Sequence, residues 1–166
     1  SILAVKFFNH QKLKFISSGV FSVAIIFFAY ITHERCKVWW SGKTLWTDVI
    51  EKSKNVPLAF LNRGNFFLEE GKTDSAISDY TSAISLRKNF VDAYYNRGAA
   101  YYGLKKFDNA ITDFSQVISE NKNDNTALYS RALCFIQQKK NTDALNDLLQ
   151  FIKTDSTNAD VFAKLG

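Results

Sequence analysis

A period of 34 residues runs through the second half of this chain and limits what it can fold into. Small and aromatic residues recur at the same offsets in blocks 57–90 and 91–124, as the pairs Gly64/Gly98, Phe67/Tyr101, Ala76/Ala110 and Tyr80/Phe114. Block 125–158 keeps this register with Ala132, Phe135, Ala144 and Leu148, and 159–166 begins a fourth with Phe162 and Gly166 in place. A period of this length predicts stacked copies of one small unit, because a single unit cannot bury its apolar face alone.

Each block has the pattern of two helices joined by a turn. In the first block we expect helices over 58–70 and 75–86, with Gly71 ending the first and Thr73 or Asp74 capping the second. Asp108 is the expected cap in the second block. Pro57 suits the first turn of its helix, where the missing N–H costs nothing. Small register residues are expected where two antiparallel helices cross closely, with bulky ones filling the space between pairs. The predicted fold class is therefore all-α, a solenoid of helical hairpins.

A shorter helix is predicted over 44–54, ahead of the first full block. Subtracting 34 from Tyr80 and Ala83 gives Trp46 and Val49, which are aromatic and aliphatic as the register asks. This segment would be the second helix of a half-repeat. It would cap the array, since a terminal repeat must bury one face and solvate the other.

The net charge of +5 belongs to the first third of the chain. Residues 1–56 hold eight Lys or Arg and three Asp or Glu, whereas 57–166 hold thirteen of each sign. A basic chain invites a nucleic-acid interpretation, but these cations flank an apolar run, which favours membrane-flanking lysines. We expect no nucleic-acid partner.

Residues 15–32 contain no charged residue and would form ~27 Å of helix, close to the ~30 Å hydrocarbon core of a bilayer. We therefore predict a transmembrane helix over 15–32, after a basic and apolar flank, 1–14, and before an interfacial linker, 33–43. A cleaved signal peptide would need small residues after the apolar run, and a repeat array has no core large enough to hide such a helix. The expected localisation is an integral membrane protein. Three cations lie close on each side of the run, so charge does not orient it.

The two cysteines, Cys36 and Cys134, match no disulfide framework or zinc spacing, and we expect two free thiols. The chain begins without an initiator methionine and stops inside a repeat. We expect it to be a piece of a longer protein.

The register residues closely resemble the tetratricopeptide repeat over 57–158. That family has a bulky residue at position 4, Gly or Ala at 8, an aromatic at 11, Ala at 20 and an aromatic at 24. Position 4 is filled here by Phe60, Tyr94 and Leu128. The departures are Arg63, Arg97 and Arg131 at the usual leucine position 7, and Lys88, Lys122 and Ser156 where proline is usual; we expect them to affect no more than the turns between repeats.

A second resemblance covers 15–65, an apolar helix running into a tryptophan-bearing basic segment and then repeats. It is similar to the end of the membrane region of O-mannosyltransferase-like glycosyltransferases with C-terminal tetratricopeptide repeats. The resemblance implies that the repeats face the lumen or periplasm and that catalytic acids lie upstream of this chain.

Residues for chemistry are sparse. The two histidines, His10 and His33, both flank the apolar run, and no catalytic pairing can be built from them within the repeats. Glu69 and Glu70 are adjacent on a helix and point about 100° apart, so they form a solvated face more often than an acid/base pair. No phosphate-binding glycine loop or metal-ligand cluster is found. We predict no catalytic residue, cofactor, metal or small-molecule substrate in this chain.

What remains is a surface for a protein or peptide partner. In the repeat family, positions 2, 5, 6, 9, 12 and 13 face a concave groove, and the candidates here are Leu61, Asn62, Asn65, Glu69, Tyr95, Asn96, Tyr102, Tyr129, Ser130, Ile136 and Gln137. Tyrosine and asparagine suit recognition of an extended peptide, although groove tyrosines can instead pack on neighbouring repeats.

A carboxylate clamp, the form of the repeat that grips a chain-terminal acid, needs lysines and an arginine in this groove. Asn65 and Asn96 fit it, whereas Leu61, Thr126 and Ser130 do not, so we expect no binding of chaperone tails. Two functions follow from the sequence. One is a membrane-anchored scaffold that docks protein partners; the alternative is the accessory tail of a polytopic glycosyltransferase.

Overall fold

The structure is a computed structural model that describes residues 23, 25–34, 36, 41–53 and 55–154. Every regular element in these residues is a helix, which confirms the all-α prediction. The helices are α2 (Gly42–Lys52), α3 (Pro57–Glu69), α4 (Thr73–Leu86), α5 (Val91–Gly103), α6 (Phe107–Glu120), α7 (Asn125–Gln137) and α8 (Asn141–Thr154). Pro57 is the first residue of α3, as expected. The chain divides into two compact units, Ser1–Leu45 and Trp46–Gly166, and α3–α8 belong to the second.

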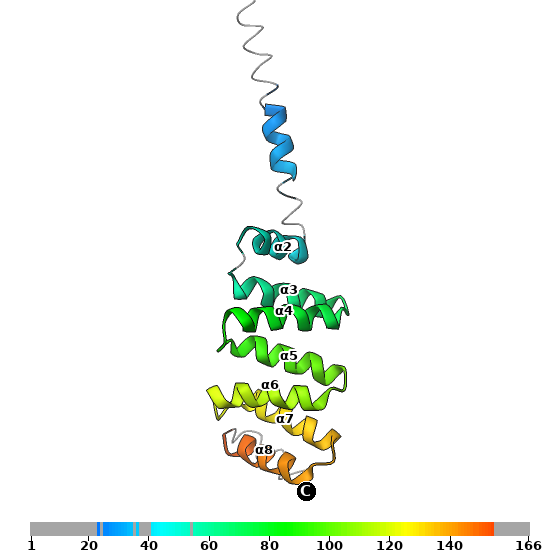
Figure 1. Ribbon diagram of the computed structural model, residues 1–166, viewed down its shortest axis with the longest axis vertical. Coiled ribbons are helices and arrows are strands. Elements are labelled where there is room, and N and C mark those ends of the chain that lie inside the picture. Colours follow the sequence, from blue (N-terminus) through cyan, green and yellow to red (C-terminus); the bar gives the residue numbers. More distant parts are fainter. Residues whose placement is uncertain (1–22, 24, 35, 37–40, 54, 155–166) are drawn as a thin grey trace, which may run out of the picture. The chain divides into compact units, whose positions relative to one another are not determined.

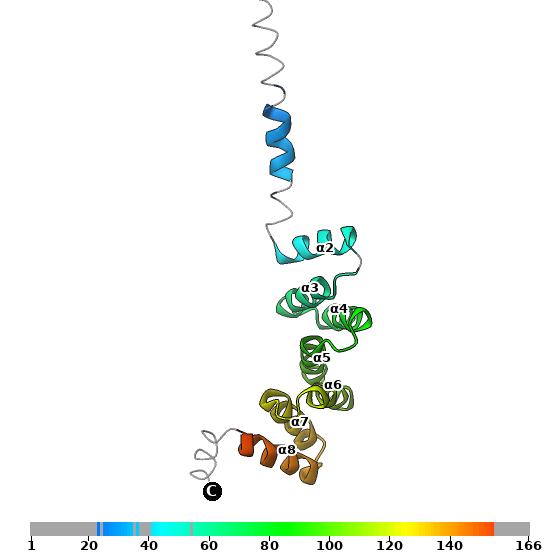
Figure 2. The ribbon, with the colours of Figure 1, turned by 90° about the vertical axis from the view of Figure 1, so that its left-hand side faces the viewer.

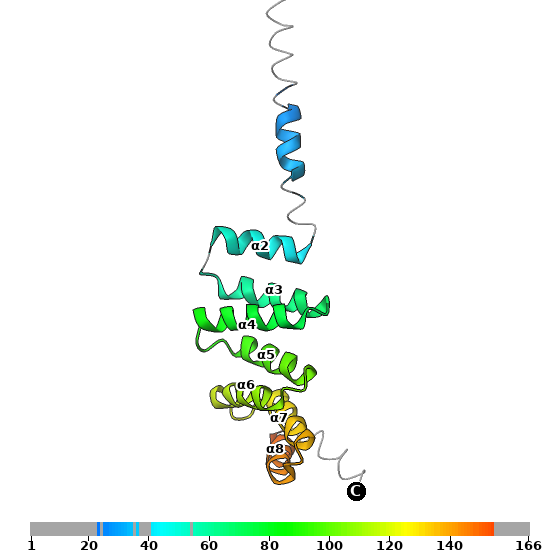
Figure 3. The same cartoon turned by 45° about the vertical axis from the view of Figure 1, so that its right-hand side comes forward.

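Helices α3–α8 stack in chain order, and each packs on the helix before it (Figure 1). Figure 2 shows α3 and α5 on one side of the stack and α4 and α6 on the other. The direction of the helices turns along the stack, so that α3 and α4 are seen from the side in Figure 3 while α7 and α8 are seen more nearly end-on. The first helices also contact one another, α3 with α5 and α5 with α7, whereas α4 and α6 make no such contact in the described residues. The first helices therefore line the inner, concave side.

The turns inside the helix pairs share one backbone conformation. Gly71, Lys105 and Lys139, at intervals of 34 residues, have φ of 75°, 58° and 59°. The N–H of Lys72 donates to the carbonyl of Phe67, and that of Lys106 to Tyr101, at 2.8 and 2.9 Å. This is the left-handed termination that satisfies the last carbonyls of a helix, and it confirms Gly71 as the end of the first helix.

The predicted caps of the second helices were wrong. Lys72 and Lys106 occupy the N-cap positions of α4 and α6, and neither makes a side-chain capping bond. Thr73, Asp74 and Asp108 lie inside the first helical turn, because the left-handed turn residue starts the second helix one or two residues earlier than expected. A side-chain cap does occur at α7, where Asp124 accepts from the N–H of Ala127 at 2.9 Å.

Three buried ion pairs repeat with the 34-residue period. Each arginine at position 7 donates two bonds to an aspartate sixteen residues later, at 2.7–2.8 Å, in the pairs Arg63–Asp79, Arg97–Asp113 and Arg131–Asp147. The Nη1 of each arginine also reaches a hydroxyl on the second helix of the preceding pair, at Thr47, Thr81 and Ser115 (3.5, 3.0 and 2.8 Å). All three aspartates are buried. The arginines therefore join the two helices of a pair and hold that pair to the one before it, rather than affecting only the turns.

Aromatic rings complete the surroundings of these arginines. The guanidinium carbon of Arg63 lies 5.7 Å from the ring centroids of both Phe60 and Phe67, and that of Arg97 lies 5.6 and 6.0 Å from Tyr94 and Tyr101. The bidentate bond to Asp113 raises the pKa of the Arg97 guanidinium above its ordinary value. A planar, always charged group suits both a carboxylate and an aromatic face, which explains why lysine would not serve here.

The prediction of an integral membrane protein was wrong. Among the residues that the structure describes, no helix combines the length and the apolar character needed to cross a bilayer. Residues 25–34, which include the end of the predicted span, are helical. Residues 15–22 and 24 of the predicted span lie outside the described residues. The predicted membrane partner likewise finds no support in the described residues.

Other expectations also lie outside the described residues. They concern the flank 1–14, residues 35 and 37–40 of the expected linker, and the start of a fourth repeat at 159–166. The capping helix expected over 44–54 corresponds to α2, which runs from Gly42 to Lys52.

Candidate functional site

The concave side holds a pocket of about 410 Å³ between α3 and α5. Its wall is formed by Asn65, Leu68 and Glu69 of α3, by Asn96 and Ala99 of α5, and by the ring of Tyr80 of α4. Asn65, Glu69 and Asn96 were candidates from the sequence, and the structure brings these three together. We call this site the asparagine pocket.

One oxygen organises the polar groups of the asparagine pocket. The Oδ1 of Asn65 accepts a hydrogen bond from the hydroxyl of Tyr80 at 2.8 Å and another from the Nδ2 of Asn96 at 2.9 Å. Both lone pairs of that oxygen are therefore used. The Nδ2 of Asn65 and the Oδ1 of Asn96 make no hydrogen bond with the described residues, which leaves a donor group and an acceptor atom in the wall of the pocket available to a ligand.

Burial fixes the third member of this network. Tyr80 has no exposed surface, and this burial raises the pKa of its hydroxyl to about 12, with a smaller contribution from the negative charges of Asp79 and Glu69. The hydroxyl therefore stays protonated at neutral pH and remains a donor to Asn65. Because Tyr80 holds Asn65 and Asn65 holds Asn96, the two amides are ordered before any ligand arrives.

A second pocket lies one repeat further along, at the same register. Its volume is about 90 Å³, and it is lined by Ala99, Tyr102, Phe114, Ser130 and Leu133. Leu133 replaces Ala99, Tyr102 replaces Leu68, and Phe114 replaces Tyr80, so larger or less polar groups fill the equivalent space. We call this site the apolar pocket; Tyr102 and Ser130 are the sequence candidates that it contains.

The groove tyrosines are engaged in packing, which was the alternative considered for them. The ring centroid of Tyr95 lies 5.6 Å from that of Phe114, and its hydroxyl lies 3.4 Å from the Oγ of Ser130. Tyr102 packs on Phe107 and Tyr129 on Phe151, at 5.7 and 5.8 Å. Their rings therefore support the groove by packing, while Tyr129 remains 44% exposed.

The remaining candidates lie outside both pockets. Leu61 is 6% exposed and belongs to the core around Tyr80. Tyr129 and Ile136 are each 44% exposed, Gln137 is exposed, and Asn62 is partly buried. The structure therefore spreads the sequence candidates over the core, two pockets and an open surface.

Sequence reasoning assigned Tyr80 and Phe114 to packing alone, yet each forms a wall of a pocket. Leu68, Ala99 and Leu133 were also missed as pocket residues. A signal for Tyr80 was present, because its hydroxyl sits at a register position where the other repeats have Phe114 and Leu148. No group of three or more His, Cys, Asp or Glu side chains in the described part of the chain could hold a metal ion.

Family profiles match most of the helical array. Residues 64–105 match a profile described as TPR repeat, and residues 91–124 and 126–157 each match a profile described as tetratricopeptide repeat. No curated protein matches the chain. The resemblance of 15–65 to glycosyltransferases finds no support in these matches.

Solved structures share the fold. The crystal structure of MamA protein is 20% identical with a TM-score of 0.64, and the match covers 69% of this chain and 63% of that one. MamA 41-end from Desulfovibrio magneticus RS-1 is 19% identical with a TM-score of 0.66, over 74% and 71%. The second TPR of Spaghetti (RPAP3), bound to the HSP90 peptide SRMEEVD, is 26% identical with a TM-score of 0.57, over 60% and 92%. This chain thus spans less than two thirds of the first MamA structure.

Proposed function

Because the chain belongs to the tetratricopeptide-repeat family, we propose that it is a scaffold that docks an extended peptide segment of a protein partner along its concave face. The observation that carries this proposal is the ordered amide pair of the asparagine pocket. Its free donor on Asn65 and free acceptor on Asn96 are complementary to the C=O and N–H of a peptide backbone. The adjacent apolar pocket, lined by Tyr102 and Leu133, would take one small apolar side chain.

Peptide docking also occurs in RPAP3, whose second TPR is bound to an HSP90 peptide in its solved structure. The groove of this chain differs in the groups that would meet a terminal carboxylate. Leu61 is in the core, and Thr126 and Ser130 carry no charge. We therefore propose that the groove reads the backbone and side chains of an internal segment rather than a chain end. The peptide SRMEEVD should bind no better with a free carboxylate than as its C-terminal amide.

The test is selection of random phage-displayed peptides on the full chain, followed by affinity measurement of the selected peptides on variants. Asn96→Ala removes the free acceptor and the bond to Asn65, so we expect affinity to fall about tenfold, as for the loss of one or two hydrogen bonds. Asn109→Ala, an exposed asparagine on α6, is the matched control and should leave affinity unchanged. If folded Asn96→Ala binds the selected peptides as wild type does, the amide pair is not a docking site.

A further inference from the structure

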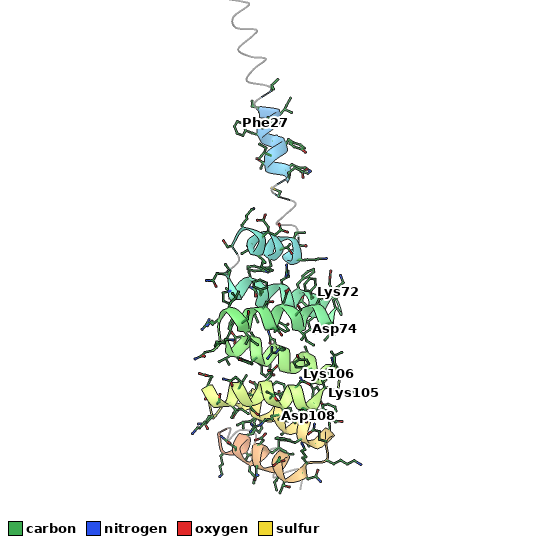
Figure 4. All side chains as sticks on the ribbon, in the orientation of Figure 1. Phe27, Lys72, Asp74, Lys105, Lys106 and Asp108 are labelled. Atoms are coloured by element: carbon green, nitrogen blue, oxygen red, sulfur yellow. The ribbon has the colours of Figure 1, made fainter. Side chains whose placement is uncertain are left out.

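Charge is distributed unevenly between the groove and the rest of the array. The six groove positions of the three repeats hold two carboxylates, Glu69 and Asp92, and no lysine or arginine. Residues 57–166 as a whole hold thirteen charges of each sign, and the excess of positive charge lies in residues 1–56. Charges of both signs lie at the turns inside the helix pairs, where Lys72, Lys105 and Lys106 alternate with Asp74 and Asp108 along one edge of the stack (Figure 4). The groove therefore carries a net negative charge within an array whose charges balance overall.

The two groove carboxylates lie on either side of the amide pair. Glu69 follows Asn65 by four residues on α3, and Asp92 precedes Asn96 by four residues on α5, so each shares a helix face with its asparagine. The helices α3 and α5 run in the same direction, because two chain reversals separate them. Each carboxylate is therefore ~6 Å along the helix axis from the hydrogen-bonded asparagines, and the two lie in opposite directions from them.

Neither carboxylate has an ion-pair partner in the described residues, although Asp92 lies in the first turn of α5, where the helix dipole favours a negative charge. Lys72, in the turn that follows α3, bonds Glu70 at 2.7 Å. Glu69 is also the last residue of α3, at the negative end of the helix dipole, where a carboxylate is unfavourable for the helix itself. Glu69 itself forms part of the wall of the asparagine pocket.

We propose that the partner segment is basic, with a lysine or arginine on each side of the backbone portion held by Asn65 and Asn96, paired with Glu69 and Asp92. This inference rests on the proposed peptide-docking function. Side chains four residues apart in an extended peptide share one face and lie ~13 Å apart. That separation suits two carboxylates that stand ~12 Å apart along the helix axis. An acidic segment would meet two unpaired like charges and is disfavoured.

The test compares two pools of capped random peptides, one with lysine and one with glutamate fixed at two positions four residues apart. Binding to the full chain is measured by fluorescence anisotropy. The net positive charge of the chain favours the glutamate pool, whereas the two groove carboxylates favour the lysine pool. The two causes therefore predict opposite preferences between the pools. We expect the lysine pool to bind several-fold more tightly, about two- to fivefold for each exposed ion pair. The preference should shrink as salt is raised.

Variants assign the preference to the groove. Glu69→Gln with Asp92→Asn should abolish the lysine preference, whereas Glu120→Gln, an exposed acid at the end of α6, should preserve it. If both pools bind equally and both lose affinity on Asn96→Ala, the docking function stands and the charge proposal is wrong. If neither pool depends on Asn96, the docking function itself fails. A lysine preference that survives the double substitution would also overturn the charge proposal.

Discussion

The ring of Tyr80 lies across Gly64 so closely that a Cβ atom on residue 64 would stand 2.6 Å from the Cε1 of that ring. The equivalent pair in the next repeat is looser, because a Cβ at Gly98 would meet Phe114 at 3.0 Å. In the third repeat the pair is Ala132 and Leu148, where a methyl group is present and the ring is absent. The size of the residue on the first helix is therefore matched to the size of its partner on the second.

Gly64→Ala should destabilise the array by ~1–2 kcal/mol. Forcing a methyl group against the Tyr80 ring costs up to ~3 kcal/mol, whereas alanine stabilises a helix by only ~1 kcal/mol relative to glycine. Tyr80 cannot withdraw freely, since its hydroxyl is bonded to Asn65. Gly98→Ala should change stability by less than ~0.5 kcal/mol, because the looser contact lets the helix gain offset the strain. Urea unfolding of the full chain measures both.

Adding Tyr80→Leu to Gly64→Ala copies the third repeat. The double variant should be more stable than the sum of the two single effects predicts. Strict additivity, or a Gly98→Ala chain less stable than Gly64→Ala, would contradict the size matching.

Arg97→Ala should cost ~3–5 kcal/mol, because it leaves the carboxylate of Asp113 buried without its partner. Replacing both residues by leucine removes the charges together and is expected to be close to neutral. The exposed pair of Lys52 and Asp48 is the comparison, and Lys52→Ala should cost less than ~1 kcal/mol. A double leucine variant as unstable as Arg97→Ala would show that the ion pair itself, with its hydroxyl contact, is favourable.

The turn conformation predicts two substitutions of opposite sign. Gly71→Ala should lose ~1 kcal/mol, since φ of 75° strains any residue with a Cβ. Lys105→Gly relieves the same strain and should gain ~0.5 kcal/mol after the entropy of the more flexible unfolded chain is counted. Thermal unfolding checks both. A loss of stability in Lys105→Gly would mean that the lysine makes a compensating contact in the folded state.

The two thiols should react at very different rates. Cys36 is exposed, whereas Cys134 is buried, and burial raises the pKa of Cys134 to about 11. At pH 8 almost none of it is thiolate, the reactive form, and its reactivity should rise only as the pH approaches that pKa. Ellman's reagent should titrate one thiol in the native full chain and a second after denaturation. Cys36→Ser should remove the native reaction, and rapid labelling of that variant would disprove the burial of Cys134.

The fold was predictable because the residues that recur every 34 positions pack the helices together in each repeat. Small residues such as Ala76 permit close helix crossing wherever they recur, so a fixed period is enough to place the helices. The membrane prediction rested on one uncharged run, and no helix in the described residues combines the length and the apolar character that a membrane span requires.

The site was only partly predictable. Asn65 and Asn96 are 31 residues apart, and their contact follows from the register. The asparagine pocket is larger than the apolar pocket because smaller side chains occupy equivalent positions, such as Ala99 in the first and Leu133 in the second. The ion pairs were missed, although Asp79, Asp113 and Asp147 recur with the arginines and could have been paired with them.

The arginine at position 7 of each repeat contacts a hydroxyl at the equivalent position of the preceding helix pair, on Thr47, Thr81 or Ser115. Excising residues 91–124 would place Arg131 against Thr81, a contact that the array already contains between Arg97 and Thr81. The junctions between repeats are therefore interchangeable. The array can gain or lose a whole repeat without requiring a new kind of contact between repeats. The residues that we propose for recognition, such as Asn65 where the next repeat has Ala99, do not take part in these junctions.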